Sequence, residues 1–175
     1  MKKLLILTVA VALVGLFSMQ LANAAELSVT VTVLGEAGFS LNPASWAIGS
    51  ISPGAVVAMD TPILIDNTGT LTQTFSLGVT GSVWTSGGTI GNVDHNKFVM
   101  ATKLLGTGVA APLSGDYVDG DVLYSSARAC DGTIFGGGGL NAEPSVDLNM
   151  WLLFQAPTST STTTQQAITV NVTSQ

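Results

Sequence analysis

Alternation of hydrophobic and polar residues marks both ends of the chain that follows residue 25. Residues 27–33 alternate Leu and Val with Ser and Thr, and residues 167–173 place Ile and Val between Thr and Asn. Successive side chains of a strand point to opposite faces of its sheet. Each segment therefore predicts a strand with one apolar face in a core and one hydroxyl-rich face outward.

Shorter apolar runs bounded by turn residues predict further strands between these two. They cover 39–41, 47–51, 61–66, 72–80, 83–84, 98–105, 122–124 and 150–155. The segment 52–55, Ser-Pro-Gly-Ala, predicts a turn, because proline presets φ at the second position and glycine tolerates the third. The Ser/Thr-rich residues 158–165 predict a hairpin connection rather than a domain boundary.

Helical periodicity is missing from every stretch of about ten residues after position 25, and the best helical candidate is about one turn near 125–130. About eight to ten short strands with frequent turns predict an all-β fold, a β-sandwich, with a closed barrel as the alternative. We find no repeat and no linker, so residues 25–175 predict a single domain.

The first 24 residues follow a different pattern. Lys2 and Lys3 precede an apolar run, 4–17, of about 14 residues, which is shorter than the roughly 20 that span a bilayer. Residues 22–24, Ala-Asn-Ala, form a small-x-small pattern, which predicts cleavage between Ala24 and Ala25. We therefore expect a helical signal peptide over 1–24, a secreted, periplasmic or cell-surface location, and no transmembrane segment in the mature chain.

Charge narrows the choice of partners. The chain has a net charge of −6, and cleavage leaves only Lys97, Lys103 and Arg128 as basic residues. Three scattered cations do not build a phosphate-binding face, so nucleic acid and anionic membrane surfaces are not expected partners. Low charge and abundant Thr suit a secreted β protein that packs against copies of itself, and the alternative is a soluble monomer.

Two segments resemble known families. Residues 46–54, Trp-Ala-Ile-Gly-Ser-Ile-Ser-Pro-Gly, followed by 63–69, Ile-Leu-Ile-Asp-Asn-Thr-Gly, resemble the aromatic-x-x-Gly, Pro-Gly and Asn-x-Gly pattern of secreted bacterial immunoglobulin-like domains of the ASPM/SPD-2/Hydin type. The strand around Trp151 is similar to bacterial surface domains of the WxL type. Both resemblances imply an immunoglobulin-like β-sandwich used for binding or assembly, and neither supplies a catalytic residue.

Three carboxylates within 116–121 form the one candidate metal site. Asp116, Asp119 and Asp121 offer oxygen ligands, and Gly120 permits a sharp turn, which suits Ca²⁺. The spacing does not complete an EF-hand loop. The alternative is a solvated acidic turn, in which Asp and Gly serve the backbone.

Catalytic chemistry finds little support. His95 follows Asp94, but neighbours on an extended chain point to opposite faces, and no nucleophile elbow is present. The single cysteine, Cys130, predicts a buried, inert thiol, with an intermolecular disulfide as the alternative. The four glycines 136–139 lack the Lys and Ser/Thr of a phosphate loop and predict a surface loop. We therefore expect a protein that is not an enzyme and needs no cofactor other than the candidate Ca²⁺.

The tryptophans leave two functions open. Trp46, Trp84 and Trp151 serve either as core anchors or as a platform for carbohydrate, and Trp84, beside the Ser-Gly-Gly of 86–88, is expected to be the most exposed. We expect an exported structural or interaction protein, for example a self-assembling surface subunit, with other protein subunits or surface components as partners. The alternative is a glycan- or ligand-binding module. Neither terminal strand carries a Lys, Pro or bulge, so each is either paired within the domain or free to pair between subunits.

Overall fold

The computed structural model describes residues 27–34, 38–135, 147–162 and 164–174. The expected signal peptide, with its cleavage point at Ala24 and Ala25, and the four glycines 136–139 lie outside these residues. Within them the chain forms strands and two one-turn 3-10 helices. No helix in the described ranges has the length and apolar character needed to cross a membrane.

The elements follow one another in this order: β1 (Leu27–Leu34), β2 (Ser40–Asn42), β3 (Ser45–Ile51), β4 (Val56–Ala58), β5 (Ile63–Asp66), β6 (Phe75–Gly81), β7 (Thr85–Ser86), β8 (Lys97–Gly106), η1 (Ser114–Asp116), η2 (Asp119–Asp121), β9 (Arg128–Ala129), β10 (Asp147–Gln155) and β11 (Gln166–Ser174).

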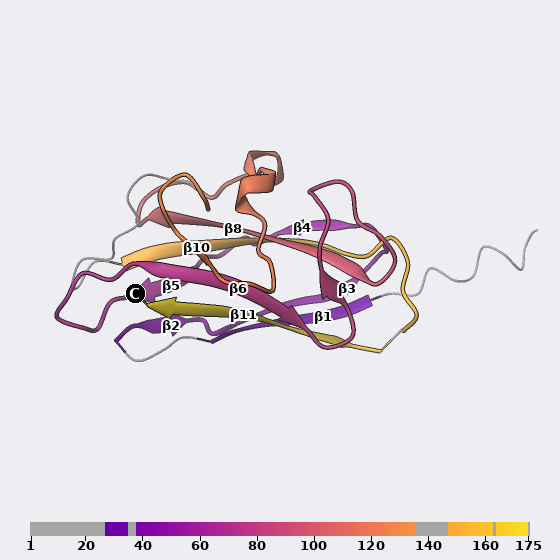
Figure 1. The fold of residues 1–175 in the computed structure, drawn as a ribbon, viewed down its shortest axis with the longest axis horizontal. Coiled ribbons are helices and arrows are strands. Elements are labelled where there is room, and N and C mark those ends of the chain that lie inside the picture. Colours follow the sequence, from indigo (N-terminus) through magenta and orange to yellow (C-terminus); the bar gives the residue numbers. More distant parts are fainter. Residues whose placement is uncertain (1–26, 35–37, 136–146, 163, 175) are drawn as a thin grey trace, which may run out of the picture.

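Two sheets pack face to face, which confirms the predicted β-sandwich (Figure 1). We call them sheet A, with the order β3-β1-β11-β6-β9, and sheet B, with the order β2-β5-β10-β8-β7. Strands β4 and β5 follow each other along the same edge of β10. The hairpin predicted for 158–165 is wrong, because β10 and β11 lie in different sheets and this segment crosses between them.

Both terminal strands are internal. β1 lies between β3 and β11, antiparallel to β3 and parallel to β11, with Val29 opposite Gln166 and Leu34 opposite Asn171. The other side of β11 pairs with β6. The backbone of each terminal strand is thus paired within the domain, which is the first of the two outcomes that the sequence left open.

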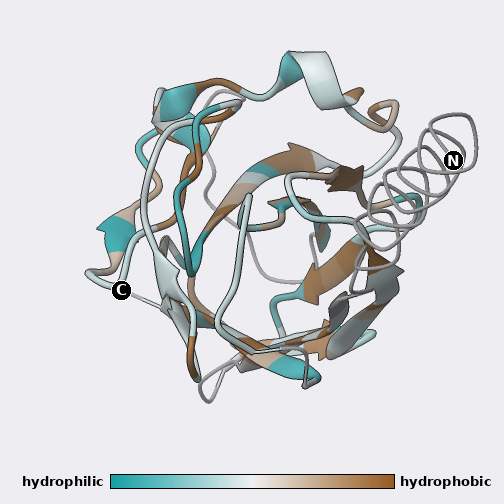
Figure 2. Cartoon of the chain, turned by 90° about the vertical axis from the view of Figure 1, so that its right-hand side faces the viewer, coloured by the Kyte–Doolittle hydropathy of each residue, from teal (hydrophilic) through white to brown (hydrophobic). Residues whose placement is uncertain are grey.

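The main core lies between the sheets, where the alternating positions of the two layers meet. Sheet A contributes inward residues that are at most 2% exposed: Val29, Val31, Val33, Phe75, Leu77, Val79, Ile168, Val170 and Val172. Sheet B contributes Ile63, Ile65, Phe98, Met100, Leu104, Met150, Leu152 and Phe154. Hydrophobic colouring gathers on the strands of both layers in the end-on view of Figure 2.

A second core covers the outer face of sheet B. Residues 107–121, which we call the cap, carry η1 and η2 over this side of the molecule, where η1 contacts β4 and η2 contacts β8 (Figure 1). The cap residue Tyr117 is buried in the cluster on that face. The other buried members of this cluster are Val93, Val99, Ala101, Val122, Trp151 and Leu153. Strands β8 and β10 are therefore buried on both faces, which explains their nearly continuous apolar sequences.

Several local predictions are wrong. Residues 83–84 form a bend, and the strand there is β7 instead. Residues 122–124 make only an isolated bridge, between Val122 and Ala101. The helical turn expected near 125–130 is extended and contains β9. Strand β4 was not predicted.

Candidate functional site

Four of the five strands of sheet A carry no charged side chain, the exception being β9 with Arg128. Strands β1, β3, β6 and β11 contain no Asp, Glu, Lys or Arg. Because the inward side chains of β1 and β11 alternate with the outward ones, the outer surface over β3, β1 and β11 consists of small polar or aliphatic residues. We call this surface the threonine face, and it comprises Ser28, Thr30, Thr32, Ser45, Ala47, Ala167, Thr169, Asn171 and Thr173.

The threonine face can meet a partner without removing charges from water. Thr32 and Thr169 are direct neighbours across the β1–β11 pair at its centre. Their hydroxyl groups both donate and accept hydrogen bonds, and dehydrating a hydroxyl costs far less than dehydrating an ion. This chemistry suits packing against another neutral surface.

The sheet edges are poorly suited to adding a strand. Edge strand β3 has a register shift opposite Val29 and Thr30, and Gly49 there has a φ of 79°. Strands β7 and β9 have two residues each, and β2 has three. Bulges and short strands are devices that block edge-to-edge pairing. A partner is therefore more easily bound on the face of a sheet than by adding a strand to its edge.

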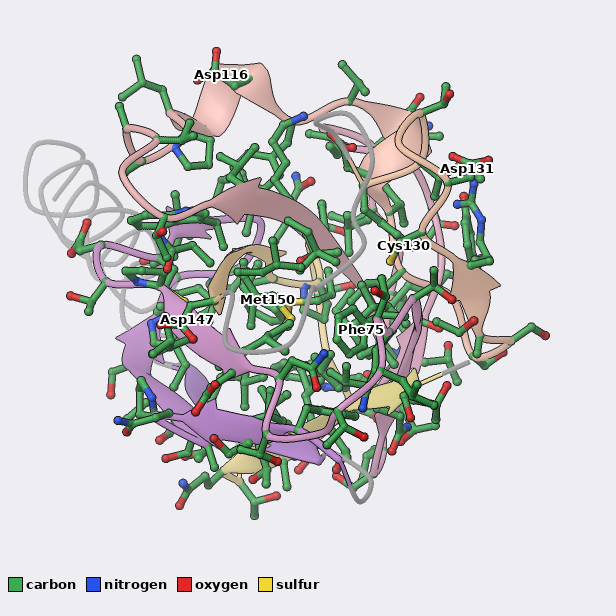
Figure 3. All side chains as sticks on the ribbon, turned by 90° about the vertical axis from the view of Figure 1, so that its left-hand side faces the viewer. Phe75, Asp116, Cys130, Asp131, Asp147 and Met150 are labelled. Carbon is green, nitrogen blue, oxygen red and sulfur yellow. The ribbon has the colours of Figure 1, made fainter. Side chains whose placement is uncertain are left out.

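The three acidic residues of the cap hold separate partners. The Asp116 Oδ2 atom accepts from the backbone N–H of Leu113 at 2.7 Å, and the Asp119 Oδ1 atom accepts from that of Ile90 at 3.0 Å. Figure 3 shows Asp116 on the outside of the cap. Among the residues that the structure describes, no group of three or more acidic, His or Cys side chains converges to bind a metal. The calcium site thus has no geometric support.

Asp121 differs from the other two and is not the solvated residue of the alternative reading. Its side chain is 1% exposed, and its Oδ2 atom accepts from the backbone N–H of Val118 at 2.9 Å and pairs with the Lys103 Nζ atom at 2.9 Å. Sequence reasoning missed this pair. A signal was present, because Lys103 is the single charge inside an apolar predicted strand, and such a residue needs a partner when buried.

His95 and Cys130, the candidate base and nucleophile, have different surroundings. His95 is exposed, and its Nδ1 atom lies 2.9 Å from the Ser159 Oγ atom. Cys130 is 8% exposed beside the main core. Burial, and then the charge of Asp131, raises the pKa of the Cys130 thiol to about 12. The inert thiol expected from the sequence agrees with this environment.

The tryptophans do not form a carbohydrate platform. The prediction that Trp84 is exposed is wrong, because it is 1% exposed, stacks near Phe154, and donates its Nε1–H to the Thr160 Oγ1 atom at 2.9 Å. Trp151 is 5% exposed in the second core, as expected of a core anchor, and Trp46 is half-buried. Among the aromatic side chains in the described ranges, only Tyr124 is well exposed, with 37% of its surface accessible to solvent.

One groove of about 200 Å³ opens beside Trp84. It is lined by Val79, Thr80, Gly81, Trp84, Thr85, Ser86 and Ser125. It lacks a charged side chain and is smaller than the roughly 300–1,000 Å³ of typical ligand pockets. Neither an acid–base pair nor an activated nucleophile is placed there.

Two sequence comparisons with known proteins found no match to this chain. No protein-family model matches the chain, and no curated protein matches its sequence. The assignment of function therefore depends on the surfaces of the molecule itself, among which the threonine face combines exposure with an absence of charge.

Proposed function

We propose that this chain is an exported structural or interaction protein of the cell envelope or extracellular space, which packs its threonine face against copies of itself or against surface components. The observation that carries the proposal is the uncharged outer surface over β3, β1 and β11 of sheet A, set opposite a sheet B whose outer face is already covered by the cap. Export rests on the pattern of residues 1–24.

The size of the threonine face predicts the strength of the contact. Three strands about 4.8 Å apart, with a rise of about 3.3 Å per residue, make a face of about 14 Å by 26 Å, or roughly 400 Å². Two such faces bury roughly 800 Å², below the roughly 1,200–2,000 Å² of stable specific interfaces. We therefore expect weak pairwise association, which becomes extensive only at high concentration or in a repeating array.

Sedimentation velocity of the mature protein over a concentration series tests the proposal. The wild-type protein should self-associate as its concentration rises. Thr169→Lys places a charge at the centre of the face and should abolish association, while Thr107→Lys, at an exposed position outside the face, should leave it unchanged. All three proteins should keep the same far-UV circular dichroism spectrum.

Two results would contradict the proposal. A wild-type protein that stays monomeric at the highest concentration excludes self-assembly, and loss of association in both lysine variants alike would show a general charge effect. Binding of the monomer to a polysaccharide matrix would instead favour the glycan-binding alternative. The secreted protein should also begin at Ala25 by mass spectrometry, and a retained Met1 would overturn the export part.

A further inference from the structure

Lys103 and Asp121 form a closely enclosed pair beneath the cap. The Lys103 Nζ atom lies 2.9 Å from the Asp121 Oδ2 atom, and the two side chains are 15% and 1% exposed. Lys103 lies on the outer face of β8, directly across from Trp151 of β10. Tyr117, with its ring centroid 5.9 Å from Nζ, covers the pair from the cap. An amine and a carboxyl group are thus held in contact with little access to water.

The two oxygen atoms of Asp121 have different surroundings. Oδ2 accepts from the Val118 backbone N–H at 2.9 Å in addition to its contact with Lys103. Oδ1 is buried and has no hydrogen-bond partner, and neither does the buried hydroxyl of Tyr117. One oxygen is therefore fixed by a backbone donor, while the other is free to change its bonding.

The contact allows a proton to pass between the two groups. A proton that moves from the ammonium to the carboxylate cancels both charges. The products of that transfer, a free amine and a carboxylic acid, are the reactants of amide formation. Contact at hydrogen-bond distance supplies the proximity that such a reaction needs.

We propose that Lys103 and Asp121 become joined by an intramolecular isopeptide bond between Nζ and Cγ. The proton moves from Nζ to Oδ2, the oxygen in contact with it. The Nζ lone pair then attacks Cγ, and the C=O electron pair moves onto Oδ1. The nitrogen passes a second proton to the Oδ2 hydroxyl group, the Cγ–Oδ2 bond breaks, and Oδ2 leaves as water while the carbonyl reforms at Oδ1. The step is a condensation that consumes no oxidant and no other reactant.

Neighbouring groups define the surroundings of this step. The Val118 N–H donates to Oδ2 at 2.9 Å and so helps to hold the carboxyl group in contact with Nζ. The Tyr117 ring lies 5.9 Å from Nζ, and its buried hydroxyl has no hydrogen-bond partner. Burial, followed by the charges of Asp121 and Asp116, raises the pKa of Tyr117, so the phenol stays protonated at neutral pH.

Intact mass spectrometry of the purified mature protein under denaturing conditions tests the proposal. Wild-type protein should be lighter than its sequence mass by one water molecule. Lys103→Arg keeps the charge of the ion pair but lacks the attacking amine, so its mass should equal its sequence mass. Asp121→Asn should lose one ammonia molecule instead of water, because the amide nitrogen then leaves.

A succinimide at Asp119-Gly120 or Asp131-Gly132 would also cost one water molecule, and the variants separate the two products. A succinimide would survive in Lys103→Arg, and hydroxylamine would cleave it. Proteolysis of the wild-type protein should yield one branched peptide that joins the segments containing Lys103 and Asp121. A wild-type mass equal to the sequence mass, or a water loss retained in Lys103→Arg, would overturn the proposal.

Discussion

At the scale of single residues, Gly81 has the closest neighbour at its Cβ position among the glycines in the described ranges. It ends β6 where the chain turns to place Trp84 in the main core, and a Cβ atom there would lie 2.2 Å from the Trp84 carbonyl oxygen and 3.0 Å from the Phe98 ring. Backbone oxygen and a buried ring have little room to move. The burial of Trp84 thus depends on the absence of a side chain three residues earlier.

We predict that Gly81→Ala lowers the free energy of unfolding by about 1–3 kcal/mol, since overpacking forces the backbone to shift. Gly106→Ala is the matched control, because nothing lies within 4 Å of its Cβ position and Gly106 also ends a strand. Urea denaturation of both variants gives the comparison. Equal stability of the two would show that the turn before Trp84 adapts freely.

The sequence could not predict the burial of Trp84 or Asp121, because both depend on distant residues. The neighbours of Trp84 along the chain are turn residues, and its burial is completed by Phe154 and by the Thr160 hydroxyl group. Asp121 is buried against Lys103 of β8, which lies 18 residues earlier in the chain. Local composition gave an exposed ring and a solvated carboxylate at these positions.

At the scale of elements, the positions of strands with a clear hydrophobic pattern could be predicted from the sequence. Which strands pair with which could not. Alternation located β1 and β11, and long apolar runs located β8 and β10. The parallel pairing of β1 with β11 joins residues at opposite ends of the chain, and no local signal encodes it. The cap was missed because its burial comes from single residues, such as Tyr117, rather than from a periodic face.

Deleting residues 27–33 should abolish folding. The deletion removes the central strand between β3 and β11 together with Val29, Val31 and Val33, all at most 2% exposed. Differential scanning calorimetry should show no cooperative transition. A truncated protein that keeps a sharp transition and has only lost association would instead mean that β1 serves contacts between subunits.

The Ser/Thr segment after β10, residues 158–165, is held in place by side-chain hydrogen bonds to the loop before β8. Asn96 exchanges hydrogen bonds with Ser161, and the Thr158 hydroxyl group donates to the Val93 carbonyl oxygen at 3.3 Å. These contacts tie the crossing segment to the loop between β7 and β8. Hydroxyl side chains of this kind satisfy backbone groups that strands leave unpaired.

At the scale of the whole molecule, the two cores share β8 and β10. A change that destabilises one core should therefore destabilise the other. Each core contains one group whose ionisation burial opposes: Cys130 beside the main core and Tyr117 in the second. Folding raises the pKa of the Cys130 thiol from 9.0 to about 12, and it raises that of the Tyr117 phenol above 10.0. The folded state therefore holds more protons than the unfolded state at alkaline pH.

Stability should consequently be independent of these groups below about pH 9 and fall as the pH rises through 9 to 12. Each group contributes at most about 1.4 kcal/mol per pH unit above its unfolded pKa. Urea denaturation between pH 8 and pH 11 measures the slope. Cys130→Ala and Tyr117→Phe should each flatten it, and equal stability at both ends of the range would refute the assignment.

The parallel pairing of β1 with β11 also determines how the domain responds to tension. Because the strands run in the same direction, the start of β1 and the end of β11 lie at opposite ends of their paired stretch (Figure 1). A force that pulls the chain before β1 away from the chain after β11 therefore shears the whole ladder, and its hydrogen bonds must break together rather than one after another. The molecule should therefore resist a pull along this direction more strongly than a pull that opens the β1–β11 ladder one hydrogen bond at a time.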